Sequence, residues 1–207
     1  MKQIKTAALL KSYYKKDCLE AGCDEAGRGC YAGPVFAAAV ILPENFYHPL
    51  LNDSKQVKPA AREQLRHYIQ ANALAWAVAS ITVEEIDRLN ILKASQKAMH
   101  LALGSLKPAP EHILVDGNYF IPFKKIAYQC IVRGDSQYAA VAAASILAKT
   151  HRDEYMRTLH KEFPNYGWDA NKGYGTAAHR QAIAQYGLSK HHRRSFNIVP
   201  SQLELFA

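Results

Sequence analysis

Fold and chemistry both depend on one stretch of this chain, which reads Gly22-Cys23-Asp24-Glu25-Ala26-Gly27-Arg28-Gly29. Two adjacent carboxylates end a short apolar run and lead directly into a glycine turn that holds one arginine. Side chains alternate along a strand, so Asp24 and Glu25 can serve one site only if the strand ends near them. The glycines permit that ending and let backbone N–H groups approach a ligand, while Arg28 offers a positive fork suited to phosphate. The stretch therefore predicts a cation-binding acidic pair beside an anion-binding turn.

Apolar runs separated by turn residues predict an α/β arrangement around this stretch. We expect strands over residues 19–23, 35–42, 73–81, 112–115 and 126–132. Helix start and stop signals predict helices over residues 59–72, 90–104, 137–163 and 176–186, with a loop over 165–175. A third acid, Asp116, follows the predicted strand over residues 112–115, and Asp135 lies just before the long helix. The acids therefore stand at the ends of apolar runs.

Length and composition indicate one ordinary globular domain. The chain has 207 residues, of which 49% are hydrophobic and 21% charged. We expect a single domain over residues 1–196, with a basic helical C-terminal part, and a tail over residues 197–207. No apolar stretch is long enough to span a bilayer and the N-terminus lacks the apolar core of a signal peptide, so we expect a cytoplasmic protein without a membrane partner. The four cysteines form no C-x-x-C pair and are expected to be reduced.

An excess of positive charge favours a polyanionic partner. The chain carries 26 Lys and Arg residues against 18 Asp and Glu, a formal net charge of +8. The excess is concentrated in residues 149–194, where nine Lys and Arg residues accompany four Asp and Glu residues. His191 and His192 belong to this segment, and we expect them on its basic surface rather than in a metal site. The long helix carries a stripe that we assign to core packing, which includes Ala140, Ala143, Ala144 and Leu147.

A functional site is indicated by four acids taken together: Asp24, Glu25, Asp116 and Asp135. Any one of them alone could be a structural acid at a strand end or helix cap. Carboxylates that converge in a cleft beside the core repel one another unless cations neutralise them. Hard oxygen ligands select Mg²⁺ or Mn²⁺, and no Cys or His spacing indicates zinc. We therefore expect all four acids to converge at one edge of the sheet and to bind divalent metal.

A series of motifs extends this pattern over most of the chain. In order, they are Asp24-Glu25-Ala26-Gly27-Arg28-Gly29, Ala32-Gly33-Pro34-Val35, Asp53-Ser54-Lys55, Val115-Asp116-Gly117, Gly134-Asp135-Ser136, Ala142-Ala143-Ala144-Ser145-Ile146-Leu147-Ala148-Lys149, Lys172-Gly173-Tyr174 and His191-His192-Arg193-Arg194-Ser195-Phe196. Together they resemble the bacterial ribonuclease HII family. The resemblance implies a ribonuclease-H-like fold, with a central mixed sheet flanked by helices and a helical C-terminal region. It also implies an endoribonuclease that hydrolyses the RNA strand of RNA/DNA hybrids and cuts at single ribonucleotides embedded in duplex DNA, for ribonucleotide and RNA primer removal.

The resemblance also assigns roles to residues of this sequence. The four metal ligands of the family fall on Asp24, Glu25, Asp116 and Asp135. The resemblance implies that these residues are catalytic and bind two divalent ions, Mn²⁺ or Mg²⁺. Cleavage would leave a 3′-hydroxyl and a 5′-phosphate. The Gly27-Arg28-Gly29 turn would contact the 2′-hydroxyl, the sugar group that distinguishes RNA from DNA. Tyr174 would stack on the neighbouring deoxyribose at an RNA-to-DNA junction. From its loop sequence alone, Tyr174 could instead be a packing residue.

Several further polar residues are predicted to contact the substrate. They are Ser54, Lys55, Lys149, Arg193 and Arg194. Basic contacts of this kind hold phosphate and make affinity fall as the salt concentration rises. For each lysine, a solvated surface position is an equally good interpretation.

The segment Gln202-Leu203-Glu204-Leu205-Phe206 resembles the short motif by which bacterial proteins dock on the DNA polymerase sliding clamp. Two leucines and a phenylalanine on a polar tail are unfavourable exposed surface unless they find a pocket or fold back. The candidate partner-binding residues are Gln202, Leu203, Leu205 and Phe206. Packing within the chain is the alternative.

Two other classes of protein compete with this interpretation. A nucleotide-cofactor enzyme would need a G-x-G-x-x-G turn that leads into a helix, whereas a second apolar strand follows the glycines here. A non-catalytic nucleic-acid-binding module would explain the basic charge but not the strand-end acids, because carboxylates that face phosphate weaken binding without metal. Nothing in the sequence demands a dimer, and we expect a monomer.

Overall fold

A five-stranded mixed sheet forms the centre of the fold, in the strand order β3-β2-β1-β4-β5. The computed structural model describes residues 10–198 of the chain. The strands are β1 (Glu20–Ala26), β2 (Val35–Ile41), β3 (Ala75–Ile81), β4 (His112–Asp116) and β5 (Ala127–Ile131). β2 pairs antiparallel with β1 and β3, whereas β4 runs parallel to β1 and β5. The predicted α/β fold with a mixed central sheet is therefore confirmed.

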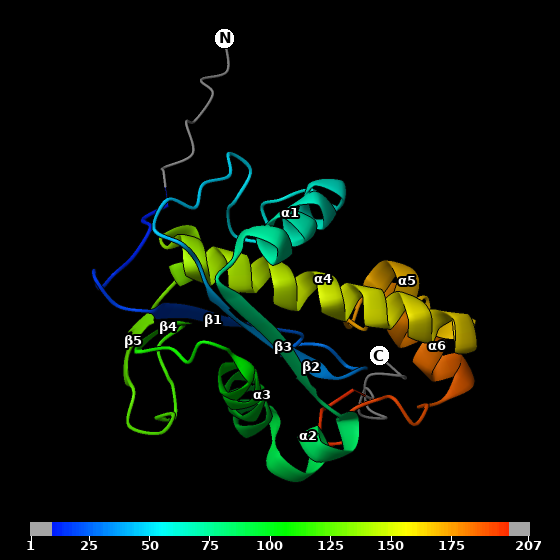
Figure 1. Ribbon diagram of the computed structural model, residues 1–207. Helices are drawn as coiled ribbons and strands as arrows, with labels where there is room; N and C mark the ends of the chain where they lie inside the picture. The colour runs from blue at the N-terminus through cyan, green and yellow to red at the C-terminus, as the bar shows by residue number, and fades with distance from the viewer. Residues whose placement is uncertain (1–9, 199–207) are drawn as a thin grey trace.

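Helices cover both faces of the sheet (Figure 1). They are α1 (Pro59–Asn72), α2 (Val83–Leu89), α3 (Ile91–Ser105), α4 (Ala139–Glu162), α5 (Trp168–Asn171) and α6 (Ala177–Tyr186), with 3₁₀ turns η1 (Gly134–Ser136) and η2 (Pro164–Tyr166). α3 packs on one face against β1, β2 and β3, while α4 packs on the other against β1 and β2, with α1 beside it. α5 and α6 gather around the C-terminal end of α4 and form the predicted helical C-terminal region (Figure 1).

The helix starts use the capping residues that the sequence offers. Pro59 occupies the first turn of α1, where its missing N–H costs nothing. Thr82 Oγ1 accepts a hydrogen bond from the Glu85 N–H at 3.4 Å and so begins α2. Asn90 Oδ1 accepts one from the Lys93 N–H at 3.1 Å and so begins α3. Local side-chain chemistry therefore decides where these helices begin.

Two local expectations are wrong. β1 does not end at the two carboxylates but continues to Ala26, because the pairing with β2 extends to the contact between Ala26 and Phe36. The loop expected over residues 165–175 contains the short helix α5, which lies between left-handed residues at Gly167 and Lys172. In both cases tertiary pairing or packing adds regular structure beyond the apolar runs that the sequence pattern marks.

The close approach of α4 to β1 depends on small side chains. A Cβ at Gly22 would overlap backbone atoms of Ala140 and Val141. The predicted core stripe is confirmed, since its members are 0–4% exposed: Ala140, Ala143, Ala144 and Leu147. The small face of α4 therefore lies directly on the strand and carries the polar residues of the same helix to the end of β1.

Aromatic and histidine side chains form the core of the C-terminal helical region. Trp168 and His179 are 0% exposed and His192 is 1% exposed. Burial lowers the pKa of His179, and burial together with the neighbouring imidazole lowers the pKa of His192 to about 4. The prediction that His192 lies on a basic surface is therefore wrong, because desolvation keeps it neutral in the interior. Lys190 and Arg194 on either side of it are exposed.

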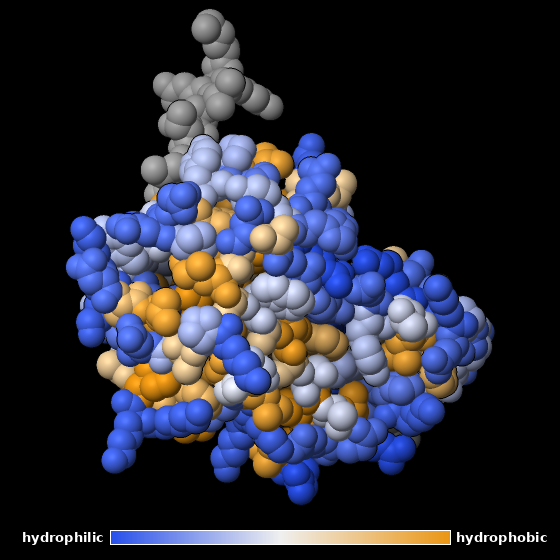
Figure 2. All heavy atoms as spheres, viewed as in Figure 1, coloured by the Kyte–Doolittle hydropathy of each residue, from blue (hydrophilic) through white to orange (hydrophobic). Residues whose placement is uncertain are grey.

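Hydrophobic side chains on the face shown in Figure 2 gather mainly over β3 and the helices beside it, with hydrophilic residues around them. Large apolar side chains at this sheet edge include Leu74, 51% exposed, and Trp76, 38% exposed.

Within residues 10–198, no helix is both long and apolar enough to cross a membrane.

We predict that Gly22→Ala lowers the free energy of unfolding by about 3 kcal/mol or more, because the new methyl group meets backbone atoms that cannot rotate away. Gly104→Ala in α3 is the matched control. Its Cβ would lie 3.7 Å from the Phe123 ring, an ordinary contact, and alanine is favoured over glycine in a helix by about 1 kcal/mol. Urea denaturation of both variants measures the difference, and equal stability of the two would contradict the role given to Gly22.

Candidate active site

Two of the predicted acids meet because β1 and β4 run parallel in register. The pairing brings Asp24 and Asp116 to the same level of neighbouring strands. Asp116 Oδ1 accepts a hydrogen bond from the Gly134 N–H at 2.8 Å, which draws in turn η1 and with it Asp135. One carboxylate oxygen of each acid lies within 4.8 Å of the others. This edge of the sheet therefore holds a three-acid cluster with the geometry to hold a metal ion.

Burial and like charge act together on the three-acid cluster. Asp24 is 5% exposed and Asp135 is 4% exposed. Burial raises the pKa of Asp24 well above its ordinary value, and the charges of Glu25 and Asp116 raise it further. Burial, the Asp116 charge and the neighbouring Asp53 raise the pKa of Asp135 to about 6. Bare anions are unfavourable in such a place at neutral pH, and a divalent cation relieves the repulsion.

Glu25 does not join the three-acid cluster. Its Oε1 forms an ion pair with Nη1 of Arg28 at 3.2 Å. Alternation along β1 gives the two consecutive side chains different directions, and Glu25 is bound to Arg28 in the turn that follows, although it lines one cavity together with Asp24. Burial raises the pKa of Glu25, and Arg28 acts against that rise. The expected convergence of four acids is therefore observed for three, with Glu25 in the adjoining cavity.

Most of the predicted substrate contacts line this adjoining cavity, which has a volume of about 220 Å³. Its lining comprises Asp24, Glu25, Gly27, Arg28, Gly29, Ser54, Lys55, Ser145, Lys149 and Tyr174, together with Ala26. Lys55 also lines a second cavity, of about 360 Å³, with Asp116 and Asp135. The fold therefore brings the acids, the glycine turn and Tyr174 to one place, although they are far apart in the sequence.

The glycine turn and the Tyr174 loop are held against each other. Tyr31 donates its N–H to the Gly173 carbonyl oxygen at 2.8 Å, and Cys30 forms a backbone bridge with Tyr174. Lys149 Nζ lies 5.6 Å from the centre of the Tyr174 ring. Tyr174 is 41% exposed, so its ring is accessible in the cavity while its backbone is fixed.

Arg193 and Arg194 lie in different environments. Arg193 is fully buried, and its guanidinium donates to the Gly33 carbonyl oxygen at 2.8 and 3.0 Å and to the Arg28 carbonyl oxygen at 2.9 Å. The prediction that Arg193 contacts phosphate is therefore wrong for this structure, because the side chain is bound inside the protein. Arg194 is exposed, and its backbone N–H donates to Asp87 Oδ2 at 3.0 Å.

Sequence reasoning missed two polar residues beside the acids. The Ser145 hydroxyl is hydrogen-bonded to Asp24, where it acts against the rise in pKa, and lies 2.9 Å from the Ser54 hydroxyl. Asp53 lies beside Asp135 in the second cavity. The signal for Ser145 is a lone hydroxyl within the alanine-rich stripe of the long helix. Asp53 belongs to the Asp53-Ser54-Lys55 motif, but it follows a loop rather than an apolar run, so its position does not group it with the other acids.

A third residue that sequence reasoning missed, Arg152, lies beneath the glycine turn. Its guanidinium donates to the carbonyl oxygens of Pro34 at 3.1 Å, Ala32 at 3.0 Å and Lys172 at 2.8 Å. A Cβ at Gly27 would overlap this side chain, and the φ of Gly27 is 99°, so the turn needs glycine there for two reasons. Arg152 therefore joins the segment that follows the turn, at Ala32 and Pro34, to the loop that carries Tyr174.

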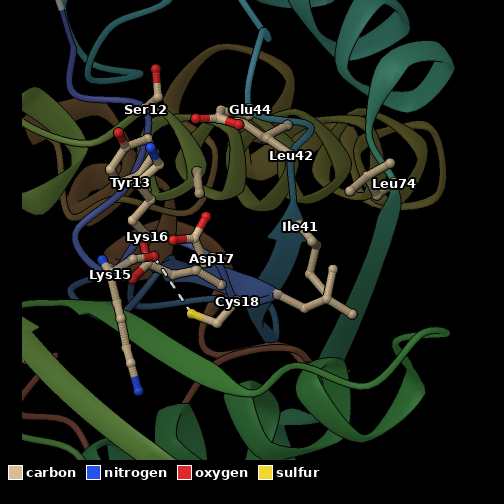
Figure 3. Close-up of a pocket in the computed structure, with 13 residues that line it drawn as sticks. Ser12, Tyr13, Lys15, Lys16, Asp17, Cys18, Ile41, Leu42, Glu44 and Leu74 are labelled. Atoms are coloured by element: carbon tan, nitrogen blue, oxygen red, sulfur yellow. Dashed lines mark hydrogen bonds between the residues drawn. The ribbon is translucent and has the colours of Figure 1, made fainter.

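Another cavity lies at the opposite end of β1, away from the acids (Figure 3). Lys15 and Asp17 of the N-terminal segment lie on one side of it, and Ile41 and Leu74 lie on the other (Figure 3). The Cys18 thiol donates to the Lys15 carbonyl oxygen at 3.5 Å. No member of the three-acid cluster lines this cavity, so we do not place the active site there.

The mixed sheet, the helices on both faces and the strand-end acids define an α/β enzyme with the ribonuclease-H-like fold. The sequence profile described as Ribonuclease HII matches residues 21–199. The chain belongs to the ribonuclease HII family and is a ribonuclease H endonuclease. It is 53% identical over 197 residues to the ribonuclease HII of Phocaeicola vulgatus, an alignment that covers 95% of this chain and 98% of the relative.

Solved structures show the same fold. The ribonuclease H2 of Pyrococcus horikoshii has a TM-score of 0.74 and 28% identity, over 86% of this chain and 94% of that protein. The ribonuclease HII of Archaeoglobus fulgidus, solved in complex with PCNA, has a TM-score of 0.73 and 25% identity, over 91% of this chain and 100% of that protein.

We predict that Asp116→Asn stabilises the metal-free protein at neutral pH by about 1–2 kcal/mol, because it removes one charge while the amide oxygen still accepts the Gly134 N–H. The folded-state pKa of Asp135, about 6, lies above its ordinary 3.8, so its contribution to stability is complete below pH 3.8 and is lost as the pH rises through about 6. The pH dependence of unfolding in EDTA should therefore be flatter for Asp116→Asn than for the wild type. Glu44→Gln, an exposed change, is the control. A variant no more stable than wild type would contradict the repulsion.

Proposed function

We propose that this ribonuclease H hydrolyses the RNA strand of RNA/DNA hybrids and cuts at single ribonucleotides embedded in duplex DNA. It would leave a 3′-hydroxyl and a 5′-phosphate and act in the cytoplasm, as a monomer, in the removal of embedded ribonucleotides and RNA primers. The observation that carries the proposal is the convergence of Asp24, Asp116 and Asp135 within 4.8 Å beside a cavity lined by the glycine turn and Tyr174. Membership of the ribonuclease HII family supports it.

Asp24, Asp116 and Asp135 are proposed to hold divalent metal, with Glu25 completing a two-ion site. The donor set fits Mg²⁺ or Mn²⁺, because it consists of carboxylate oxygens, and the raised pKa of Asp24 marks a place where a cation is favourable. The ions would supply activation of water and stabilisation of the leaving oxygen. Glu25 would turn toward them when Arg28, half exposed in its ion pair, binds a substrate phosphate instead.

The Gly27-Arg28-Gly29 turn is proposed to read the 2′-hydroxyl through its backbone. Arg193 holds the Arg28 carbonyl oxygen toward the interior. In a trans peptide the N–H points away from the C=O, so the Gly29 N–H is directed away from Arg193 and is free to meet the sugar. Tyr174, in the same cavity, would then stack on the deoxyribose that follows.

The substrate backbone is proposed to follow the basic side chains around the cavity. Lys55, Arg194 and Arg28 are exposed there or nearby and are suited to phosphate. Lys149 is bound to Asp153 Oδ1 at 2.7 Å, so it would contact phosphate from a fixed position. Ser54, which is buried against Ser145, supports the Lys55 loop at the cavity.

The tail is proposed to dock on the DNA polymerase sliding clamp. Its candidate residues, Gln202, Leu203, Leu205 and Phe206, lie outside the described residues. The complex of the Archaeoglobus fulgidus ribonuclease HII with PCNA supports a clamp as partner for this family. Clamp binding that persists after deletion of residues 202–207 would end this part of the proposal.

We predict that Tyr174→Ala lowers kcat/KM about tenfold on a duplex with one embedded ribonucleotide, because stacking on an aromatic ring is lost. Cleavage of a continuous RNA/DNA hybrid, which needs no junction, should change less. Tyr174→Phe keeps the ring and is the matched control, with selectivity close to that of the wild type. Equal losses on both substrates, or none, would contradict the junction-reading role while leaving the ribonuclease activity in place.

A further inference from the structure

The backbone of Tyr174 is held from the interior by a chain of hydrogen bonds. Its carbonyl oxygen lies 2.9 Å from Nδ1 of His179. Nε2 of His179 lies 3.0 Å from Nε1 of Trp168 and 3.1 Å from Nε2 of His192. Nδ1 of His192 lies 2.9 Å from the backbone nitrogen of Ser189. The chain therefore runs from Ser189 through two histidines to Tyr174.

Two groups that can only donate decide where the protons of this chain lie. The Ser189 backbone N–H makes Nδ1 of His192 an acceptor, and the Trp168 indole N–H makes Nε2 of His179 an acceptor. A neutral His192 therefore carries its proton on Nε2 and directs it at Nε2 of His179, whose one lone pair it shares with the Trp168 N–H. His179 carries its own proton on Nδ1 and donates it to the Tyr174 carbonyl oxygen. Both tautomers follow from their neighbours.

The interior location makes this arrangement firm. Trp168, His179 and His192 are shielded from water, and a buried polar group without a partner costs about 1–3 kcal/mol. Burial also lowers the pKa of both imidazoles, which keeps them in the neutral form that the chain requires. The ring of Tyr174 lies in the cavity at the other end of the chain, so a rigid interior network supports an accessible side chain.

Arg193, which follows His192, holds the Gly27-Arg28-Gly29 turn. This turn and Tyr174 are the two proposed recognition elements. Arg193 donates from Nη1 to the Arg28 carbonyl oxygen at 2.9 Å and from its backbone N–H to the Tyr31 carbonyl oxygen at 2.8 Å. Two consecutive residues of the C-terminal segment therefore bind the glycine turn on one side and, through His179, the Tyr174 loop on the other. These contacts add an interior link between the glycine turn and the Tyr174 loop to the hydrogen bond between Tyr31 and Gly173.

We propose that His179 and His192 are positioning residues that fix the Tyr174 ring relative to the Gly27-Arg28-Gly29 turn and thereby strengthen the preference for a single embedded ribonucleotide over a continuous hybrid. The inference rests on the proposed role of Tyr174 at an RNA-to-DNA junction. A histidine pair that only fills the core would stabilise the C-terminal region without affecting the choice of substrate.

Two substitutions of His179 separate these possibilities. His179→Asn places an amide N–H near the former Nδ1 and still donates to the Tyr174 carbonyl oxygen. His179→Gln places its amide near the former Nε2, where it can accept from Trp168 but does not reach Tyr174. The ratio of kcat/KM on the single-ribonucleotide duplex to that on the hybrid should fall about tenfold in the Gln variant, a loss of about 1.4 kcal/mol, and stay within about twofold in the Asn variant.

Tyr174→Ala, measured in parallel, distinguishes the positioning role of His179 from the junction role of Tyr174. If Tyr174→Ala lowers the ratio and His179→Gln does not, the positioning role is wrong and the junction role stands. If Tyr174→Ala leaves the ratio unchanged, both the positioning role and the junction role are wrong. Should the His179 variants fail to fold, the tautomers of the wild-type protein decide. Side-chain ¹⁵N NMR at pH 7 should show His179 protonated on Nδ1 and His192 on Nε2, and any other pair of tautomers would overturn the inference.

Discussion

The close packing of α4 on β1 is the constraint on which the rest of the structure depends. It is possible because Gly22 presents no side chain to the helix backbone at Ala140. From that contact onward, α4 directs polar residues at helical spacing toward the end of β1. Ser145 meets Asp24, Lys149 lies over the Tyr174 ring, and Arg152 lies beneath the glycine turn. A shift of α4 would therefore displace Ser145 from Asp24 and would also disturb the glycine turn and the Tyr174 loop.

Charge is arranged in this protein at the expense of stability. Three carboxylates are held together at one sheet edge, where burial and repulsion raise the pKa of Asp24 and Asp135. Hydrogen bonds from Ser145 and from the Gly134 N–H offset only part of that cost. Functional sites commonly keep such unfavourable groups, because the ligand that uses them also relieves them. A metal ion would therefore contribute to the fold as well as to the chemistry.

Buried arginines give the glycine turn its shape. The Arg193 guanidinium binds the carbonyl oxygens of Arg28 in the turn and of Gly33 after it, and the Arg152 guanidinium binds those of Ala32 and Pro34 in the segment that follows. Burial lowers the pKa of Arg193 to about 10, which leaves it charged at neutral pH. Because the Arg28 carbonyl oxygen is held inward, the opposite side of that peptide unit is left for a ligand, and the positive charge behind the turn favours an anionic one. Rigidity and electrostatic attraction therefore have the same source.

The sequence alone determined the order of the five strands and of helices α1, α3, α4 and α6, and the place of the acids near the ends of apolar runs, because these depend on local periodicity and side-chain chemistry. It could not show that Glu25 pairs with Arg28 outside the three-acid cluster or that Arg193 and His192 are interior residues. An acid, an arginine and a histidine look the same in a motif whether they face solvent or core. Only the tertiary structure decided which of them meet, because strand pairing sets the face of each side chain and packing against α4 decides which charges are excluded from water.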